Sequence, residues 1–153
     1  MKKTELVKLI ISILICQLAG IIGSIFTTSS VKQWYPLLTK PWFNPPSWVF
    51  APVWTLLFLL MGISLYLIWK KKADKALIIF GIQLLLNLLW SILFFGFRSP
   101  FFAFVEIMVL WCAILLTIFS FYRINKIAAY LLIPYILWVS FASVLNLYIV
   151  ILN

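Results

Sequence analysis

The sequence contains very little charge, and acidic residues are almost absent from it. Charged residues make up 10% of the 153 positions, whereas a soluble domain carries about 25%. The acidic residues are Glu5, Asp74 and Glu106, against twelve lysines and arginines. Because 66% of the residues are apolar, the composition excludes a water-soluble globule, and it excludes a disordered chain, which needs low hydrophobicity. One domain, residues 1–153, embedded in a lipid bilayer is the remaining class.

Histidine is missing altogether, and cysteine occurs only twice. The absence of histidine excludes histidine-ligated haem, histidine-containing zinc sites and catalytic triads built on imidazole. Cys16 and Cys112 lie near the middle of apolar runs, where a thiol is usually a small buried hydrophobe. We therefore expect no metal site and no disulfide framework.

Five apolar runs are long enough to cross a membrane, since about 20 residues span a hydrocarbon core of roughly 30 Å. No hairpin signals separate alternating strands, so helices are favoured over a β-barrel. The sequence therefore predicts an all-α integral membrane protein, a single bundle of five transmembrane helices. The expected helices and the lid loop cover residues 6–28, 46–69, 76–97, 100–121 and 127–151, with the loop at 29–46.

The basic residues lie at short intervals between the apolar runs, which argues against a nucleic-acid partner despite the net charge of +9. Nine of them fall on the side of the amino terminus and three on the opposite side. Basic loops remain in the cytoplasm, so we expect the amino terminus inside. Nothing in the amino end or the loops indicates a mitochondrial location, and a prokaryotic cytoplasmic membrane is the simpler expectation.

Polar groups within a membrane are costly and need a partner or a purpose. Two predicted helices each have one face that combines aromatic rings with carboxamides. These faces either bond to each other, with the aromatics as filler, or line a cavity for a large, flat, mainly apolar ligand. The residues are Gln83, Asn87, Trp90 and Phe94 in the third helix, and Tyr135, Trp138, Ala142, Leu145 and Asn146 in the fifth.

Three further features are less specific. Small residues recur along the first helix from Ser12 to Thr27, which indicates close helix packing and no chemistry. Glu106 is a carboxylate deep in a span, and a structural role is favoured because no chain of titratable partners accompanies it. Pro134 predicts a kink in the fifth helix.

The segment from Trp34 to Trp54 contains four tryptophans and five prolines in 21 residues. Prolines at this density exclude regular helix throughout, and a rigid aromatic loop would suit the roof of a ligand site. The run W-Y-x-x-L-x-K-P-x-F-x-P-P-x-W-V-x-x-P-V-W resembles the motif of the TspO/MBR family, which contains tryptophan-rich sensory proteins and translocator proteins. Further matches include Leu86-Asn87 with Trp90, and Pro134-Tyr135-x-x-Trp138.

This resemblance implies a five-helix bundle, usually a homodimer, with a pocket that opens toward the first loop and binds porphyrins such as protoporphyrin IX. Trp54 and Trp138 match two tryptophans implicated in light-dependent porphyrin breakdown. Asn87, Trp90, Ala142 and Leu145 match pocket positions, and Trp34 and Tyr35 are expected lid contacts. With Tyr135 from the helix face, the predicted ligand-binding residues are Trp34, Tyr35, Trp54, Asn87, Trp90, Tyr135, Trp138, Ala142 and Leu145.

Three functions are compatible with these patterns. The first is a membrane receptor or sensor for a tetrapyrrole, whose propionates would reach Lys32 or Lys40. The second is a light-dependent porphyrin-degrading enzyme that uses Trp54 and Trp138, and the third is a small transporter of porphyrin or lipid. Sterol recognition through the carboxyl-terminal motif of mammalian members is not expected, because no Lys or Arg follows Tyr148.

Overall fold

The computed structural model describes residues 1–153, and all regular structure in it is helical. Five helical segments are long and apolar enough to cross a membrane, as the apolar runs predict. The helices are α1 (Lys3–Gln33), α2 (Phe50–Trp69), α3 (Asp74–Ser91), α4 (Pro100–Tyr122), α5 (Lys126–Tyr130) and α6 (Ile133–Leu152). Shorter turns are the 3₁₀ helices η1 (Tyr35–Leu37) and η2 (Ser47–Val49), and the π-helical turn η3 (Ile92–Gly96), which continues α3.

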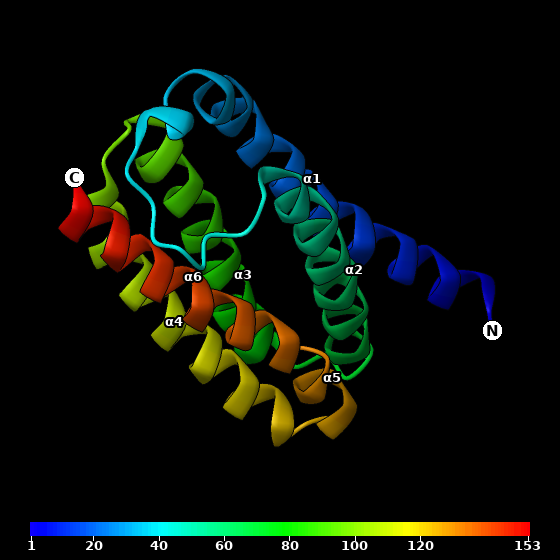
Figure 1. Ribbon diagram of the computed structural model, residues 1–153. Coiled ribbons are helices and arrows are strands. Elements are labelled where there is room, and N and C mark those ends of the chain that lie inside the picture. Colours follow the sequence, from blue (N-terminus) through cyan, green and yellow to red (C-terminus); the bar gives the residue numbers. More distant parts are fainter.

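Figure 1 shows α1 and α2 on one side of the bundle and α4 with α6 on the other, while α3 lies between them. The approach of α1 to α2 depends on Gly62. A Cβ atom at this position would lie 2.6 Å from the Cα atom of Ile13, closer than any side chain tolerates. Small residues allow helices to approach closely in lipid. The close packing of α1 on α2 therefore requires a glycine at this position of α2.

The first helix is longer than the sequence predicts. It ends at Gln33, so the expected end at residue 28 and the lid loop over 29–46 are wrong by about one turn. The hydroxyl groups of Thr27 and Thr28 explain the difference, because they donate to the carbonyls of Gly23 and Ser24 at 2.9 and 2.8 Å. Their polar groups are satisfied inside the helix, and a run of hydroxyl residues does not end it.

The fifth predicted helix is divided in two. Residues 131 and 132 separate α5 from α6, and Pro134 lies in the first turn of α6, where a missing N–H leaves no hydrogen bond unmade. The Oδ1 atom of Asn125 caps α5 by accepting from the backbone N–H groups of Ile127 and Ala128, at 2.9 and 3.2 Å. Because of this break, the aromatic face of α6 does not continue a face of α5.

Candidate ligand-binding cavity

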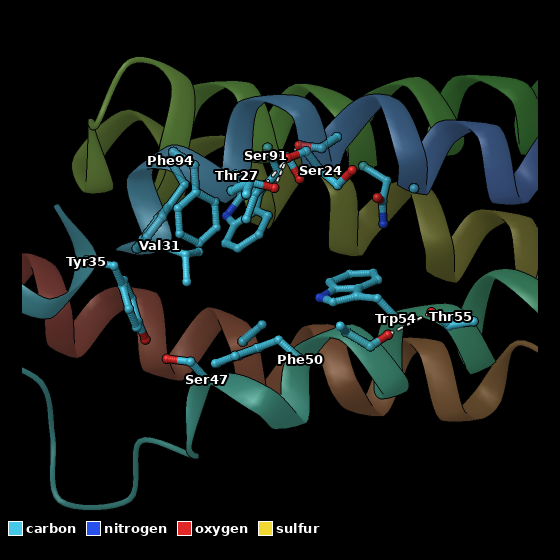
Figure 2. Close-up of a pocket in the computed structure, with 18 of the residues that line it drawn as sticks. Ser24, Thr27, Val31, Tyr35, Ser47, Phe50, Trp54, Thr55, Ser91 and Phe94 are labelled. Atoms are coloured by element: carbon cyan, nitrogen blue, oxygen red, sulfur yellow. Dashed lines mark hydrogen bonds between the residues drawn. The ribbon is translucent and has the colours of Figure 1, made fainter. Parts of the chain in front are cut away.

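A cavity of about 500 Å³ lies between α1, α2, α6 and the end of α3 with η3. Small-molecule sites typically enclose roughly 300–1,000 Å³, so the volume fits one sizeable organic ligand. Figure 2 shows Thr27 and Val31 of α1 facing Phe50 and Trp54 of α2 across this space. The cavity is therefore enclosed by elements far apart in the sequence.

Aromatic rings from α2, α3, η3 and α6 line much of the cavity. Trp90 stacks on Phe94 with ring centroids 5.3 Å apart, and Phe50 meets Trp138 edge to face at 6.0 Å. The π-helical turn η3 continues directly from α3 and carries Phe94 into the same wall. Because these rings already contact each other, the wall is a preformed apolar surface on which a flat ring system would stack.

The wall formed by α1 is polar. Ser24, Thr27 and Thr28 line the cavity, and each hydroxyl donates to a carbonyl of α1 itself. Their oxygens still have capacity to accept. Gln17 bridges the two helices at this wall, since its Nε2 atom donates to the carbonyl of Thr55 at 3.1 Å. A ligand would thus meet hydroxyl oxygens along α1 as well as aromatic rings.

The carboxamides of α3 and α6 form most of their hydrogen bonds with side chains of the other helix of this pair. The Nδ2 atom of Asn87 donates to the Tyr135 hydroxyl at 2.7 Å, and this hydroxyl donates to Oε1 of Gln83 at 3.0 Å. The Nε1 atom of Trp90 donates to Oδ1 of Asn146 at 3.1 Å. The amides therefore join the two helices, while Asn87, Trp90 and Asn146 also line the cavity. That this cavity holds a large, flat ligand stays a prediction.

Trp138 is different from these residues. Its ring lines the cavity, and its buried Nε1 donor has no hydrogen-bond partner in the protein. A buried donor without a partner costs about 1–3 kcal/mol.

The first loop closes one end of the cavity through Tyr35. The buried Tyr35 ring lines the cavity, and its hydroxyl donates to Oδ1 of Asn44 at 2.7 Å. Burial raises the pKa of Tyr35 to about 12, so the phenol keeps its proton and remains the donor at neutral pH. The loop is also fixed by Asn153, whose Oδ1 accepts from the Thr39 N–H at 3.0 Å and whose Nδ2 donates to the Thr39 carbonyl at 2.8 Å.

Two lysines were expected at the mouth, and the structure separates them. Lys32 lines the cavity. Lys40 does not, because its ammonium group donates to the carbonyls of Tyr35 and Leu38 at 2.9 and 3.0 Å and lies over the Tyr35 ring. Lys40 stabilises the loop, and Lys32 is the cation available to an anionic group of a ligand.

Most of the predicted ligand-binding residues meet at the cavity. Two do not line it. Trp34 packs edge to face on Phe94 with centroids 5.7 Å apart, outside the cavity. Tyr135 is buried behind the wall, 6.3 Å from the ring of Trp54. The predicted residues that line the cavity are Tyr35, Trp54, Asn87, Trp90, Trp138, Ala142 and Leu145.

The contribution of α1 to the cavity was not predicted. Its stripe of small residues was interpreted as packing only, yet Gly20, Gly23 and Thr27 line the cavity. The stripe itself was the available signal, because a face of small and hydroxyl residues also leaves space. Glu106 lies outside the cavity lining, buried in α4, and neither carboxyl oxygen has a hydrogen-bond partner.

These features define the class of the molecule: an integral membrane protein of five spanning segments with an aromatic cavity below its first loop. The model of the TspO/MBR family matches residues 12–152, and the chain belongs to this family. Membership supports a role as a membrane sensor or receptor.

Named relatives come from three domains of life. The chain is 45% identical to the tryptophan-rich protein TspO of Chlorobaculum tepidum, over 97% of the chain and 98% of the relative. It is 46% identical to the protein of the same name in Archaeoglobus fulgidus, over 97% and 99%. It is 37% identical to the human translocator protein, over 82% of the chain and 78% of the relative.

Proposed function

We propose that this protein is a membrane receptor or sensor that binds a metal-free tetrapyrrole such as protoporphyrin IX in the cavity. The observation that carries the proposal is the presence of three tryptophan rings, those of Trp54, Trp90 and Trp138, in the lining of one cavity. A tetrapyrrole offers the broad π-face that such rings would stack on. The absence of histidine from the sequence is consistent with a ligand that needs no axial ligation.

The rings and the one lysine in the cavity lining suggest how the ligand would lie. Its π-face would stack on the rings of Trp54, Trp90 and Trp138, and stacking contributes roughly 0.5–1.5 kcal/mol per pair beyond area burial. A propionate would reach the ammonium group of Lys32 at the cavity rim. Lys40 is excluded from this role by its two bonds to loop carbonyls.

The test is a titration of the purified protein with protoporphyrin IX in the dark, followed by tryptophan quenching and the Soret band. Trp138→Phe replaces the indole with a smaller ring and so reduces the stacking face, and we expect binding to weaken roughly 2- to 3-fold. Trp48→Phe is the matched control, because Trp48 is 74% exposed and lies outside the cavity. Absence of saturable binding, or equal loss in both variants, would contradict the proposal.

A second candidate is light-dependent breakdown of the bound porphyrin. The observation that favours it is the presence of both Trp54 and Trp138 in the cavity lining, where each would contact the ligand as an electron donor. The Trp54→Phe/Trp138→Phe double variant should bind porphyrin in the dark but bleach it more slowly under light in air. Bleaching at the same rate as the unaltered protein would exclude the enzyme. The transporter alternative rests on Glu106, which does not line the cavity.

We also propose that the protein lies in a prokaryotic cytoplasmic membrane with its amino terminus inside, as a homodimer. The basic residues support this orientation, with nine at one end of the bundle and three at the other. Bacterial and archaeal relatives align over nearly the whole chain. Labelling of single cysteines in the α2–α3 connection and in the first loop of a Cys-free background tests the orientation, and crosslinking tests the dimer.

A further inference from the structure

One end of the helix bundle carries most of the positive charge of the protein. The α2–α3 connection and α5 lie together there (Figure 1), where the Ser64 hydroxyl of α2 donates to the carbonyl of Ala128 in α5 at 2.7 Å. Only two acidic residues, Glu5 and Asp74, belong to this end. The nine basic residues are Lys2, Lys3, Lys8, Lys70, Lys71, Lys72, Lys75, Arg123 and Lys126.

The carboxylates at this end leave most of these cations unpaired. Glu5 accepts a hydrogen bond from the Tyr66 hydroxyl at 3.0 Å, and it lies 4.0 Å from the Lys8 ammonium group and 3.8 Å from that of Lys70. These are the two ion pairs of the protein. Asp74 forms none. The exposed cations without a carboxylate partner are Lys2, Lys3, Lys71, Lys72, Lys75, Arg123 and Lys126.

The helix dipole, a general reason for basic residues at helix ends, does not cover the whole set. The carboxyl end of a helix attracts cations through its dipole, which accounts for residues that follow α2 and for Arg123 after α4. Lys75 and Lys126, however, lie in the first turns of α3 and α5, where the dipole disfavours a cation. The helix dipole therefore does not account for these two cations.

The aromatic residues at this end indicate at what depth these cations lie. The Lys126 ammonium group is 5.4 Å from the centre of the Tyr122 ring, and the Tyr122 and Tyr130 rings are 6.1 Å apart. Lys8 lies over Trp69 in the same way. Exposed Trp and Tyr residues at the ends of spans occupy the level of the lipid headgroups, so the free cations lie at the depth of lipid phosphates.

We propose that the surface formed by the α2–α3 and α4–α5 connections binds the phosphate groups of anionic phospholipids. Basic residues next to spanning helices attract anionic lipid, and the strength known for such contacts corresponds to about fivefold in affinity for each cation. Lys75 and Lys126 are the residues on which the test depends, since neither has a carboxylate partner and the helix dipole does not favour either. The site is separate from the cavity and does not depend on the proposed ligand.

The test uses full-length protein in zwitterionic nanodiscs or dodecyl maltoside, titrated with fluorescent phosphatidylglycerol and separately with phosphatidylcholine. Phosphatidylglycerol should bind more tightly, and its affinity should fall as salt is raised. Lys75→Gln/Lys126→Gln should weaken its binding by about 25-fold, while Lys75→Arg/Lys126→Arg should retain it. Arg98→Gln removes a charge from the opposite end and should have no effect.

Several results would overturn this proposal. Equal affinity for the two lipids, or phosphatidylglycerol binding that does not respond to salt, excludes recognition of anionic headgroups. An equal loss in Arg98→Gln shows that overall charge and not this surface is responsible. Competition by millimolar inorganic phosphate would identify a phosphate-ion site in place of a lipid site. If the double Gln variant does not fold, the salt response and lipid preference of the unaltered protein decide the question.

Discussion

The attachment of the first loop to Asn153 can be broken by one substitution. Asn153→Ala removes the two hydrogen bonds that this side chain makes with the backbone of Thr39, at 3.0 and 2.8 Å, and a third with the carbonyl of Ile149. The aromatic contacts of the loop remain, since Phe43 still meets Tyr148 with centroids 5.2 Å apart and Phe141 at 6.2 Å. The substitution therefore isolates the polar part of loop closure.

The expected magnitude follows from the two bonds that reach the loop. Each contributes about 0.5–1.5 kcal/mol net, and the exposed position of Asn153 places both at the lower end because water replaces them. A loss of about 1–2 kcal/mol raises the population of the open loop roughly 5- to 30-fold. Ligand that leaves through this end of the cavity would dissociate faster by the same factor.

Amide hydrogen exchange measures this effect without any ligand. The Thr39 N–H loses its own acceptor in Asn153→Ala, so loop opening is followed at the Asn44 N–H, which donates to the Pro41 carbonyl at 3.0 Å. This N–H should exchange roughly 5- to 30-fold faster in Asn153→Ala than in the unaltered protein. Asn125→Ala is the matched control, because Asn125 caps α5 at the other end of the bundle, where its loss costs about 1 kcal/mol. Unchanged exchange at Asn44 in Asn153→Ala, or equal acceleration in Asn125→Ala, would refute the reasoning.

Three further outcomes can be checked. Tyr135→Phe leaves Nδ2 of Asn87 and Oε1 of Gln83 without this partner, and it should lower the free energy of unfolding by about 1–3 kcal/mol in a denaturation series. Tyr148→Phe, the control, should not lower it. Gly62→Ala puts a Cβ atom 2.6 Å from the Cα atom of Ile13, so a thermal melt should show about 1–3 kcal/mol of destabilisation. Because the pKa of Tyr35 is raised by burial to about 12, its contribution to closure is complete below pH about 10 and is lost as pH rises toward 12. Tyr35→Phe should remove this component from the pH dependence of loop opening measured by fluorescence; an unchanged profile would contradict it.

The helical class and the five spans follow from the sequence because they depend on the length and hydrophobicity of each run. A charge-free run long enough to span the hydrocarbon core must be helical wherever it folds, since its backbone groups find no water. The irregular course of the aromatic loop before α2 can be predicted in the same way, because Pro36, Pro41, Pro45 and Pro46 disfavour α-helix there.

The boundaries were harder to predict, because they depend on which polar groups find partners. The hydroxyls of Thr27 and Thr28 bond back to α1, so the helix continues through residues that usually end one. The Ser30 hydroxyl donates to the carbonyl of Phe95 at 2.5 Å, across 65 positions of sequence. No local pattern contains that contact.

Periodicity placed Tyr135 and Trp138 on one aromatic face of α6, and it could not distinguish their roles. The Tyr135 hydroxyl is hydrogen-bonded to Asn87 and Gln83 of α3, whereas the Trp138 nitrogen is buried without a partner. Lys32 and Lys40 were equivalent by position, and only the course of the loop gives Lys40 two carbonyl partners. The sequence by itself determined the helices, the number of spans and which residues share a face. Tertiary structure decided what each face meets, because a hydrogen bond or a cavity forms between helices and depends on both partners.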